Sequence, residues 1–359
     1  MIPIAKVIFS EDEIEEVVKV LRSGNVRQGK KVEEFERLFA EKVGAEYAVA
    51  VSSGTAALHV AYLSVLKPGD EVIVPAFTFI ATASTVVFAG GKPVFADIDE
   101  TLTIDVNDVL EKITPRTKAI APVHLFGNAA DMKALMEIAE DHGLYLINDC
   151  AQAHGTKIDG KDVGSFDHLN CYSFYPTKNM STGEGGMITT NDRELYERCK
   201  LIRSHGQAEK YNHVMLGLNY RMMEIQAVIG IKQLEKLDGR IKKRRKNAEY
   251  YNREFSKLDG IELPKVRKEV YHTYNQYSIL LESSKMRDKL IDEFKKEKIG
   301  YAIHYPKPLT EQPALREFVR GECPRAKDVS QRIISLPVHP YLSENDLRRV
   351  IEVVERIVS

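Results

Sequence analysis

The sequence contains no tryptophan, only four cysteines and no long apolar run. The cysteines are Cys150, Cys171, Cys199 and Cys323. They lie far apart and form no C-x-x-C pair, so we expect neither a disulfide framework nor a metal site, and a reducing cytoplasm fits. No apolar run reaches the roughly 18–20 residues of a membrane span, and the N-terminus becomes acidic by Glu11, unlike a signal peptide. The sequence therefore predicts a cytoplasmic protein that does not associate with membranes.

The sequence also has no excess of either charge, because its 51 basic residues nearly equal its 52 acidic ones in number. This balance gives no general attraction to nucleic acid. The basic cluster at 242–246 follows an apolar-periodic stretch and is typical of a solvated helix face. The sequence G-x-x-x-x-G-K-[ST] does not occur, and the glycines at 183–186 lack the G-x-G-x-x-G spacing of dinucleotide sites. We therefore expect no nucleic-acid partner, and a nicotinamide dehydrogenase is disfavoured.

Apolar residues make up 43% of the 359 residues, which is enough for a large core and favours two domains. After two amphipathic helices that end near Gly24 and Gly44, strands and helices alternate. Buried strands are predicted at 71–74, 93–96, 118–123, 144–148, 169–174 and 186–190. Helices are predicted at about 55–66, 78–89, 105–113 and 129–142. This alternation predicts a largely parallel sheet covered by helices on both faces.

The pattern changes after about residue 240. A long charged helix at about 223–256 is followed by a strand at 276–281, a helix at 285–298 and a proline-rich stretch from 306 to 340. We therefore predict a large α/β domain over residues 1–240 and a smaller α+β domain over residues 241–359.

Polar residues that follow strands are the first candidates for a site, because ligands of open α/β sheets bind at the carboxyl ends of the strands. Ser53, Gly54, Thr55 and Ala56 lie between a strand and a helix. Small residues at a helix start expose N–H groups that suit a phosphate, although a plain helix cap explains them equally well. Asp149 ends the strand at 144–149, where a carboxylate needs a cation or a donor. A capping role is the alternative.

Lys178 is a candidate nucleophile. A lysine just after a strand is usually a surface residue, but this one precedes the glycine-rich turn at 183–186 and can point into a crevice. An amine in a pocket of low dielectric loses its proton more readily and can form a Schiff base. Asn219 and Arg221 precede a helix, and arginine favours carboxylate or phosphate partners, although surface arginines are commoner.

Together these segments match what pyridoxal 5′-phosphate (PLP) requires of a protein. The lysine forms the imine, the aspartate keeps the pyridine nitrogen protonated, and the helix start anchors the phosphate. The 29-residue gap from Asp149 to Lys178 is compatible with two neighbouring strands that place these side chains at opposite ends of one ring.

These segments resemble the DegT-type (StrS-like) family of PLP-dependent nucleotide-sugar aminotransferases, which have fold-type I, the aspartate-aminotransferase-like α/β fold. The matching segments are Ser53–Thr55, Pro75–Phe79, Pro122–Gly127, Asp149–Gly155, Ser173–Asn179, His205–Gln207 and Asn219–Arg221. They follow the order of the family and span nearly the whole chain.

The resemblance implies roles for individual residues. Lys178 bonds the cofactor, Asp149 pairs with the ring nitrogen, and Gln152 lies near the phenolic oxygen. Phe79, with Phe77 as the alternative, stacks on the ring. The phosphate-binding set is Ser53, Gly54, Thr55, Ala56 and Ser173, with Asn219 from the neighbouring subunit. The family implies a homodimer with shared active sites, in which Arg221 contacts a substrate carboxylate across the interface.

The resemblance leaves the position of amination open. Because Lys178 is present where a dehydratase branch has histidine, transamination is favoured. Residues 182–187 and 219–222 resemble perosamine synthases, which aminate a 4-keto sugar. Residues 303–314, with His304 and Tyr305 as substrate-binding candidates, and residues 335–340 are more like 3-keto-sugar aminotransferases.

The sequence therefore predicts an enzyme of polysaccharide biosynthesis. It would move an amino group from L-glutamate to a nucleotide-linked 3- or 4-keto sugar by a ping-pong mechanism, with Lys178 as the proton shuttle. An amino-acid/2-oxo-acid aminotransferase of the same fold is the first alternative. A non-catalytic PLP-binding regulator is the second, and the lack of a helix-turn-helix extension in this chain disfavours it.

Overall fold

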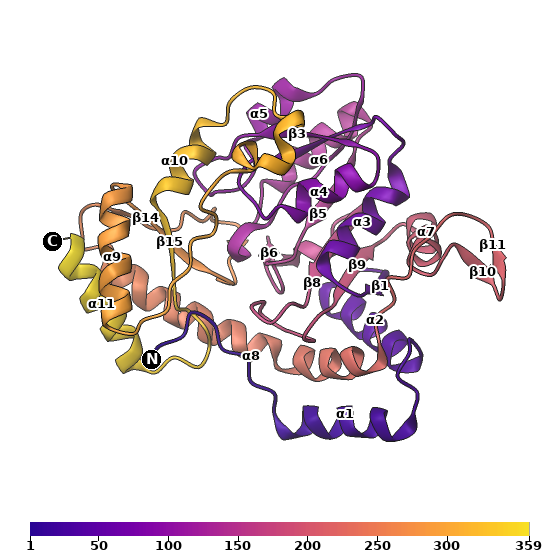
Figure 1. Cartoon of the computed structure of the whole chain (residues 1–359), viewed down its shortest axis with the longest axis horizontal. Helices are drawn as coiled ribbons and strands as arrows, with labels where there is room; N and C mark the ends of the chain where they lie inside the picture. Colours follow the sequence, from indigo (N-terminus) through magenta and orange to yellow (C-terminus); the bar gives the residue numbers. More distant parts are fainter. Residues whose placement is uncertain (359) are drawn as a thin grey trace.

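The computed structural model describes residues 1–358, which form a central seven-stranded sheet with helices on both faces and a smaller antiparallel part beside it (Figure 1). The central strands are β1 (Tyr47–Val51), β2 (Glu71–Pro75), β3 (Lys92–Ala96), β4 (Thr117–Ile120), β5 (Tyr145–Asp149), β8 (Leu169–Ser173) and β9 (Gly186–Thr190). The helices are α1 (Glu11–Ser23), α2 (Lys30–Val43), α3 (Gly54–Val65), α4 (Ala81–Phe88), α5 (Val106–Lys112), α6 (Met132–His142), α7 (Arg193–Arg203), α8 (Glu224–Phe255), α9 (Ser284–Lys296), α10 (Pro324–Arg332) and α11 (Glu344–Val358). The short strands are β6 (Lys157–Ile158), β7 (Lys161–Asp162), β10 (Gln207–Glu209), β11 (Asn212–His213), β12 (Ile261–Glu262), β13 (Val270–Tyr271), β14 (Tyr277–Leu281) and β15 (Ile333–Leu336).

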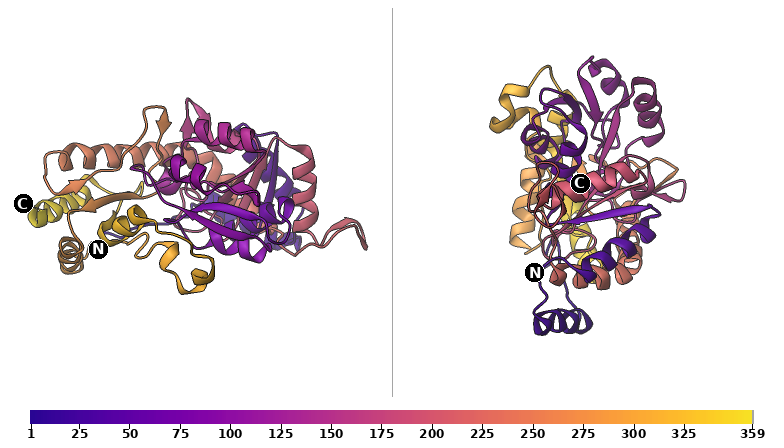
Figure 2. Two further views of the ribbon diagram at one scale, coloured as in Figure 1. Left: turned by 90° about the horizontal axis from the view of Figure 1, so that it is seen from above. Right: turned by 90° about the vertical axis from the view of Figure 1, so that its right-hand side faces the viewer.

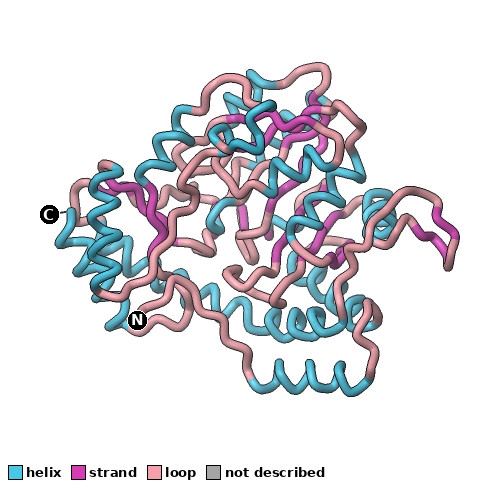
Figure 3. Tube along the Cα trace, viewed as in Figure 1, coloured by secondary structure: helices cyan, strands magenta, loops and turns pink. Residues whose placement is uncertain are grey.

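The central sheet has the order β1-β9-β8-β5-β4-β2-β3. All neighbours from β8 to β3 pair in parallel, and β9 is antiparallel to both of its neighbours. Successive side chains of a strand point to opposite faces. Val49 and Val51 accordingly pack with α3, α4 and α7, whereas Ala48 and Ala50 pack with α2 and α8. The predicted, largely parallel sheet covered on both faces is confirmed (Figure 3).

Several predicted boundaries were wrong, among them the start of the helix expected at 129–142, which begins at Met132. The strand expected at 118–123 ends at Ile120, because Pro122 has no N–H to continue the ladder. The helix expected at 78–89 begins at Ala81, because the chain stays extended beyond β2, where the Ala76 N–H donates to the Ala96 carbonyl (2.7 Å).

The smaller part is built on the antiparallel sheet β12-β14-β15, which packs with α9, α11 and the second half of α8. Ile2 belongs to the same core and is 2% exposed. Its N–H donates to the Lys298 carbonyl (3.0 Å), and its carbonyl accepts from the Gly300 N–H (2.6 Å). The domain boundary expected at residue 240 falls inside α8, which runs unbroken from Glu224 to Phe255, so the two-domain division stays a prediction.

Two elements project from the body. Helix α1 lies outside α8, and the β10–β11 hairpin extends from the far end of the molecule (Figure 2). Tyr211 and Leu216, at the hairpin and just after it, are 82% and 95% exposed. Among the described residues, no helix combines the length and the apolarity needed to cross a bilayer.

Candidate active site

A cavity of about 480 Å³ opens at the carboxyl ends of β5 and β8. Most residues singled out from the sequence line it, namely Ser53, Gly54, Thr55, Phe79, Asp149, Gln152, Ser173, Lys178, His304 and Tyr305. Ala56 lies buried in the first turn of α3, below the cavity. Asn219 and Arg221 do not line it, and Asn219 is exposed. The structure thus gathers the predicted set around one cavity, apart from Ala56 and these two residues.

Asp149 ends β5 and is 5% exposed. Its Oδ2 accepts a hydrogen bond from the Thr82 hydroxyl (2.7 Å), and its Oδ1 accepts one from the Ala151 N–H (3.1 Å). Burial raises the pKa of the Asp149 carboxyl above its ordinary value, whereas the two hydrogen bonds and the nearby Lys178 oppose this shift. The carboxylate is therefore held in a fixed orientation at the cavity wall.

Lys178 follows β8 by five residues and lines the same cavity as Asp149. Burial lowers the pKa of its amine to about 8, and the charge of Asp149 opposes the shift. An amine with this pKa is partly neutral near pH 7–8, which is the state that a nucleophile or a proton acceptor needs. Lys178 and Asp149 thus line one cavity.

The first turn of α3 forms the third wall. The Ser53 Oγ caps the helix by accepting from the Ala56 N–H (3.1 Å). A Cβ on Gly54 would lie 2.6 Å from the Ser173 Cβ, so only glycine lets this turn approach the end of β8 so closely. Gly54 and Thr55, in the first turn of α3, line the cavity, and the N–H groups of a helix start together with a threonine hydroxyl favour a phosphate.

Gln152 connects the two parts of the molecule at the cavity. Its Oε1 accepts from the Phe126 N–H (2.8 Å), and its Nε2 donates to the Tyr305 hydroxyl (3.1 Å). The Tyr305 ring lies 5.9 Å from that of Phe77 and 6.2 Å from that of Phe79, measured between centroids. Phe77 is 1% exposed, whereas Phe79 is 55% exposed and lines the cavity. Of the two, Phe79 is therefore the one that can stack on a ligand.

His304 contributes a neutral imidazole. Its Nδ1 lies 3.0 Å from the Ser335 Oγ. Burial, and secondarily the charge of Lys178, lowers the pKa of His304 to about 4. At neutral pH this ring is uncharged, and because its Nδ1 is engaged by Ser335, its Nε2 is left to donate to or accept from a polar ligand, depending on the tautomer.

Sequence reasoning missed several residues at the site. Thr82 does not line the cavity, but it is fully buried and its hydroxyl bonds Asp149. It follows Thr78 by four residues, and that spacing beside the segment 75–79 could have pointed to it. Tyr175, Thr177, Glu184 and Gln276 line the cavity itself. Gln276 comes from the loop before β14, far along the chain, and no local signal marks it.

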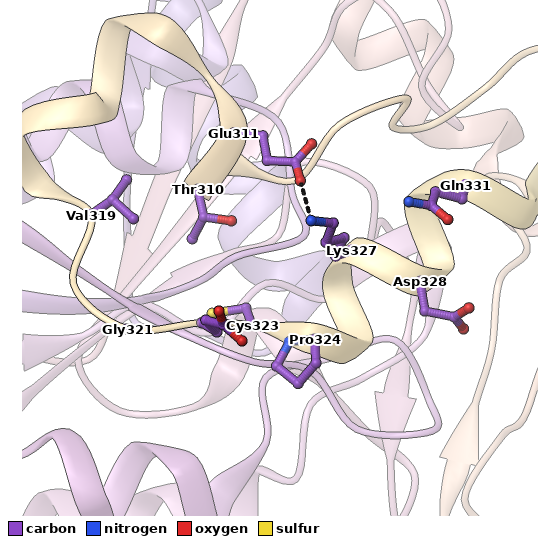
Figure 4. A pocket seen from close by; sticks show the side chains of 10 residues that line it. Thr310, Glu311, Val319, Gly321, Cys323, Pro324, Lys327, Asp328 and Gln331 are labelled. Carbon is purple, nitrogen blue, oxygen red and sulfur yellow. Dashed lines mark ion pairs between the residues drawn. The ribbon is translucent and has the colours of Figure 1, made fainter.

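A second cavity, of about 430 Å³, lies against α10. Glu311 and Lys327 point toward one another across it at 3.4 Å (Figure 4). It contains none of the residues singled out from the sequence. The cavity at β5 and β8 is therefore the candidate active site.

The candidate site fits PLP. Its donor set contains an amine with a lowered pKa, a buried carboxylate held by two donors, and a helix start whose Gly54 leaves room for close approach. Combined with the mostly parallel sheet, these features define a PLP-dependent enzyme of fold-type I.

Residues 8–355 match the DegT/DnrJ/EryC1/StrS aminotransferase family, and the chain belongs to this family of PLP-dependent transaminases. The UDP-N-acetyl-3-dehydro-alpha-D-glucosamine 3-aminotransferase of Acidithiobacillus ferrooxidans is 39% identical over 94% of this chain and 91% of that protein. The GDP-perosamine synthase of Escherichia coli O157:H7 is 39% identical over 92% of this chain and 91% of that protein. The crystal structure of Streptomyces venezuelae DesV in complex with a ketimine intermediate has a TM-score of 0.94 and 36% identity, over 97% of this chain and 94% of that one. The predicted family and fold are both confirmed.

Proposed function

We propose that this enzyme transfers an amino group from L-glutamate to a nucleotide-linked 3- or 4-keto sugar in two half-reactions at the same site. The names of the similar proteins support a nucleotide sugar as substrate, and they include both 3- and 4-aminating enzymes. The observation that carries the proposal is that Lys178 and Asp149 line one cavity beside the phosphate-binding helix start. Polysaccharide biosynthesis is the proposed setting, and a cytoplasmic location stays a prediction.

Lys178 and Asp149 are proposed as the catalytic residues. Bound PLP supplies an electron sink for the carbon that carries the amino group. Lys178 would hold PLP and then carry a proton on its Nζ. With a pKa of about 8, about a tenth of this amine is neutral at pH 7. Asp149 would keep a proton on the ring nitrogen, since its carboxylate is fixed by Thr82 and Ala151.

The remaining candidates would bind and orient the ligands. Ser53, Gly54, Thr55, Ala56 and Ser173 would hold the phosphate, Phe79 would stack on the ring, and Gln152 would contact the phenolic oxygen. His304 and Tyr305 would contact the sugar substrate. Because burial keeps His304 neutral, we expect it to bind hydroxyl groups of a sugar rather than the charged diphosphate.

The test of the reaction uses the PLP-loaded enzyme, converted to its amino form with L-glutamate and then offered single acceptors. We expect nucleotide-linked 3- or 4-keto sugars to discharge the amino form, which the change in cofactor absorbance reports. Discharge by 2-oxo acids alone would indicate an amino-acid aminotransferase. A PLP-loaded protein that neither L-glutamate nor another amino donor converts to the amino form would indicate a regulator. Lys178→Ala should lose turnover, and an active variant would reject the role of Lys178.

A homodimer with shared sites is the second part of the proposal. Asn219 is exposed and lies outside the cavity of its own chain, just after the apolar, exposed residues Val214 and Leu216. We propose that this surface packs on a second copy, so that Asn219 and Arg221 enter the partner's cavity. The test is complementation between Lys178→Ala and Asn219→Ala. Random mixing of the two should restore about a quarter of the wild-type rate, since half of the dimers would carry one intact site. Failure to restore activity would contradict shared sites without bearing on the substrate.

A further inference from the structure

A small cavity of about 20 Å³ borders the segment that carries Lys178. Its walls come from the N-terminal segment, residues 176–181, α8 and residues 340–341. It is separate from the 480 Å³ cavity, although Lys178 touches both. A volume of this size holds one water molecule or one monatomic ion, because about 10–15 Å³ of probe space admits one water.

The charge around this cavity is unbalanced. Arg244, on α8, borders it and is 6% exposed. Its side chain donates only to the carbonyls of Tyr274 (3.4 Å) and Asn275 (3.3 Å), and its Nε has no acceptor among the described residues. No carboxylate of residues 1–358 forms an ion pair with it. Although burial lowers the pKa of Arg244 to about 10, the guanidinium is still charged at neutral pH. A buried charge without a partner is strongly unfavourable.

The other polar walls add donors rather than negative charge. Arg240 borders the cavity one helical turn before Arg244, and its positive charge repels that of Arg244. The carboxylate nearest to it, that of Glu13, lies 4.0 Å away and is already bonded by the Gln233 amide (2.8 Å). Asn179 is 3% exposed, and its Nδ2 donor has no acceptor in the described part of the chain. The Arg240 guanidinium donates to the Gln233 Oε1, which also borders the cavity. The Arg244 Nε and the Asn179 Nδ2 are left without an acceptor, and no carboxylate is among the described residues that line the cavity.

We propose that this cavity binds a single monovalent inorganic anion of the chloride class, held by Arg244, Arg240 and Asn179. A water molecule would satisfy the orphaned donors but would leave the positive charge uncompensated. The bound anion would fix residues 176–181 against α8, and so it would stabilise the segment on which Lys178 stands. The proposal does not depend on the identity of the sugar substrate.

Bromide is the probe, since it replaces chloride and scatters anomalously. Crystals of the PLP-loaded enzyme grown with sodium bromide should show an anomalous peak in this cavity, in contact with Arg244 and Asn179. In solution, the thermal midpoint should be higher in sodium chloride than in sodium gluconate of equal ionic strength, because a ligand that binds only the folded state stabilises it.

Asn179→Asp supplies a carboxylate from the protein itself, at nearly unchanged size. This variant should lose both the bromide peak and the difference between chloride and gluconate. Lys243→Gln removes an exposed positive charge from the same helix outside the cavity, and it should retain both signals. A cavity that contains only water, a carboxylate from a second copy in the cavity, or a bromide peak that persists in Asn179→Asp would overturn the proposal.

Discussion

Replacing Thr82 with valine removes one of the two donors to the Asp149 carboxylate, the Thr82 hydroxyl, and leaves the Ala151 N–H. The Thr82 hydroxyl lies 2.7 Å from the Asp149 Oδ2, and both residues are buried. A hydrogen bond to a charged group contributes roughly 1.5–3 kcal/mol. Because this donor stabilises the ionised form, its loss raises the pKa of Asp149. One pKa unit corresponds to about 1.4 kcal/mol, so the expected rise is about 1–2 units.

The affinity for PLP, measured by absorbance titration across pH, reports this shift. Protonated Asp149 cannot pair with a protonated ring nitrogen, so binding should weaken below the pKa of the carboxyl. In Thr82→Val the acidic limb of the affinity profile should move upward by about 1–2 pH units. Thr82→Ser keeps the hydroxyl and should return the limb toward that of the wild type.

The matched control is Thr85→Val on the same helix. Thr85 is 1% exposed, and its hydroxyl donates to the Ala81 carbonyl (2.6 Å), away from Asp149. This variant also loses a buried hydroxyl, but it should leave the acidic limb of the PLP-affinity profile unchanged. The reasoning on Thr82 is refuted if Thr82→Val and Thr85→Val have equal thermal midpoints and both keep the acidic limb of the wild-type affinity profile.

Three other changes have defined outcomes. In Gly54→Ala the new Cβ would lie 2.6 Å from that of Ser173, and the forced shift, about 1–3 kcal/mol, should weaken PLP binding roughly tenfold or more in the same titration. Burial raises the pKa of Asp162 to about 7 from 3.8, so the folded state binds its proton more tightly and stability falls as pH rises between these values. Asp162→Asn should therefore flatten the thermal midpoint between pH 5 and 7, and an unchanged slope would contradict this. Glu224 accepts from two N–H groups in the first turn of α2, at 3.0 and 3.1 Å. Glu224→Ala should cost about 1–3 kcal/mol in urea unfolding, and Glu224→Gln less.

The central sheet could be predicted because its strands are short apolar runs between helical stripes, a pattern set by local periodicity. The elements of the C-terminal region were harder to predict from the sequence. At 306–340 the sequence predicts only a proline-rich stretch, whereas Pro324 starts α10, because proline is well tolerated in the first turn of a helix. Residues 344–358 carry a plain helical stripe, with Leu347, Val350, Ile351 and Val354 buried in α11, and this stripe was left unassigned.

The candidate site was predictable where a residue directly follows a strand, as Asp149 and Ser173 do, because the carboxyl edge of a parallel sheet collects such residues. Local sequence could not choose between Phe77 and Phe79. Phe77 and Phe79 are two positions apart in an extended segment, so their side chains are expected on the same side of the chain. Only the tertiary placement of Tyr305 distinguishes the buried ring of Phe77 from the exposed ring of Phe79. The contact of Thr82 with Asp149 spans 67 residues and depends on how α4 packs against β2 and β3 of the sheet.

The anchoring of Ile2 to Lys298 and Gly300 has a consequence for how the chain matures on the ribosome. Ile2 has no such partner until almost 300 more residues have been added, which takes roughly 15–60 s at 5–20 residues per second. The central sheet can close well before that moment. The segment from Ile2 to Lys6 therefore cannot dock before residues 298–300 have been synthesised. A nascent chain stalled before residue 298 should leave this segment open to proteases.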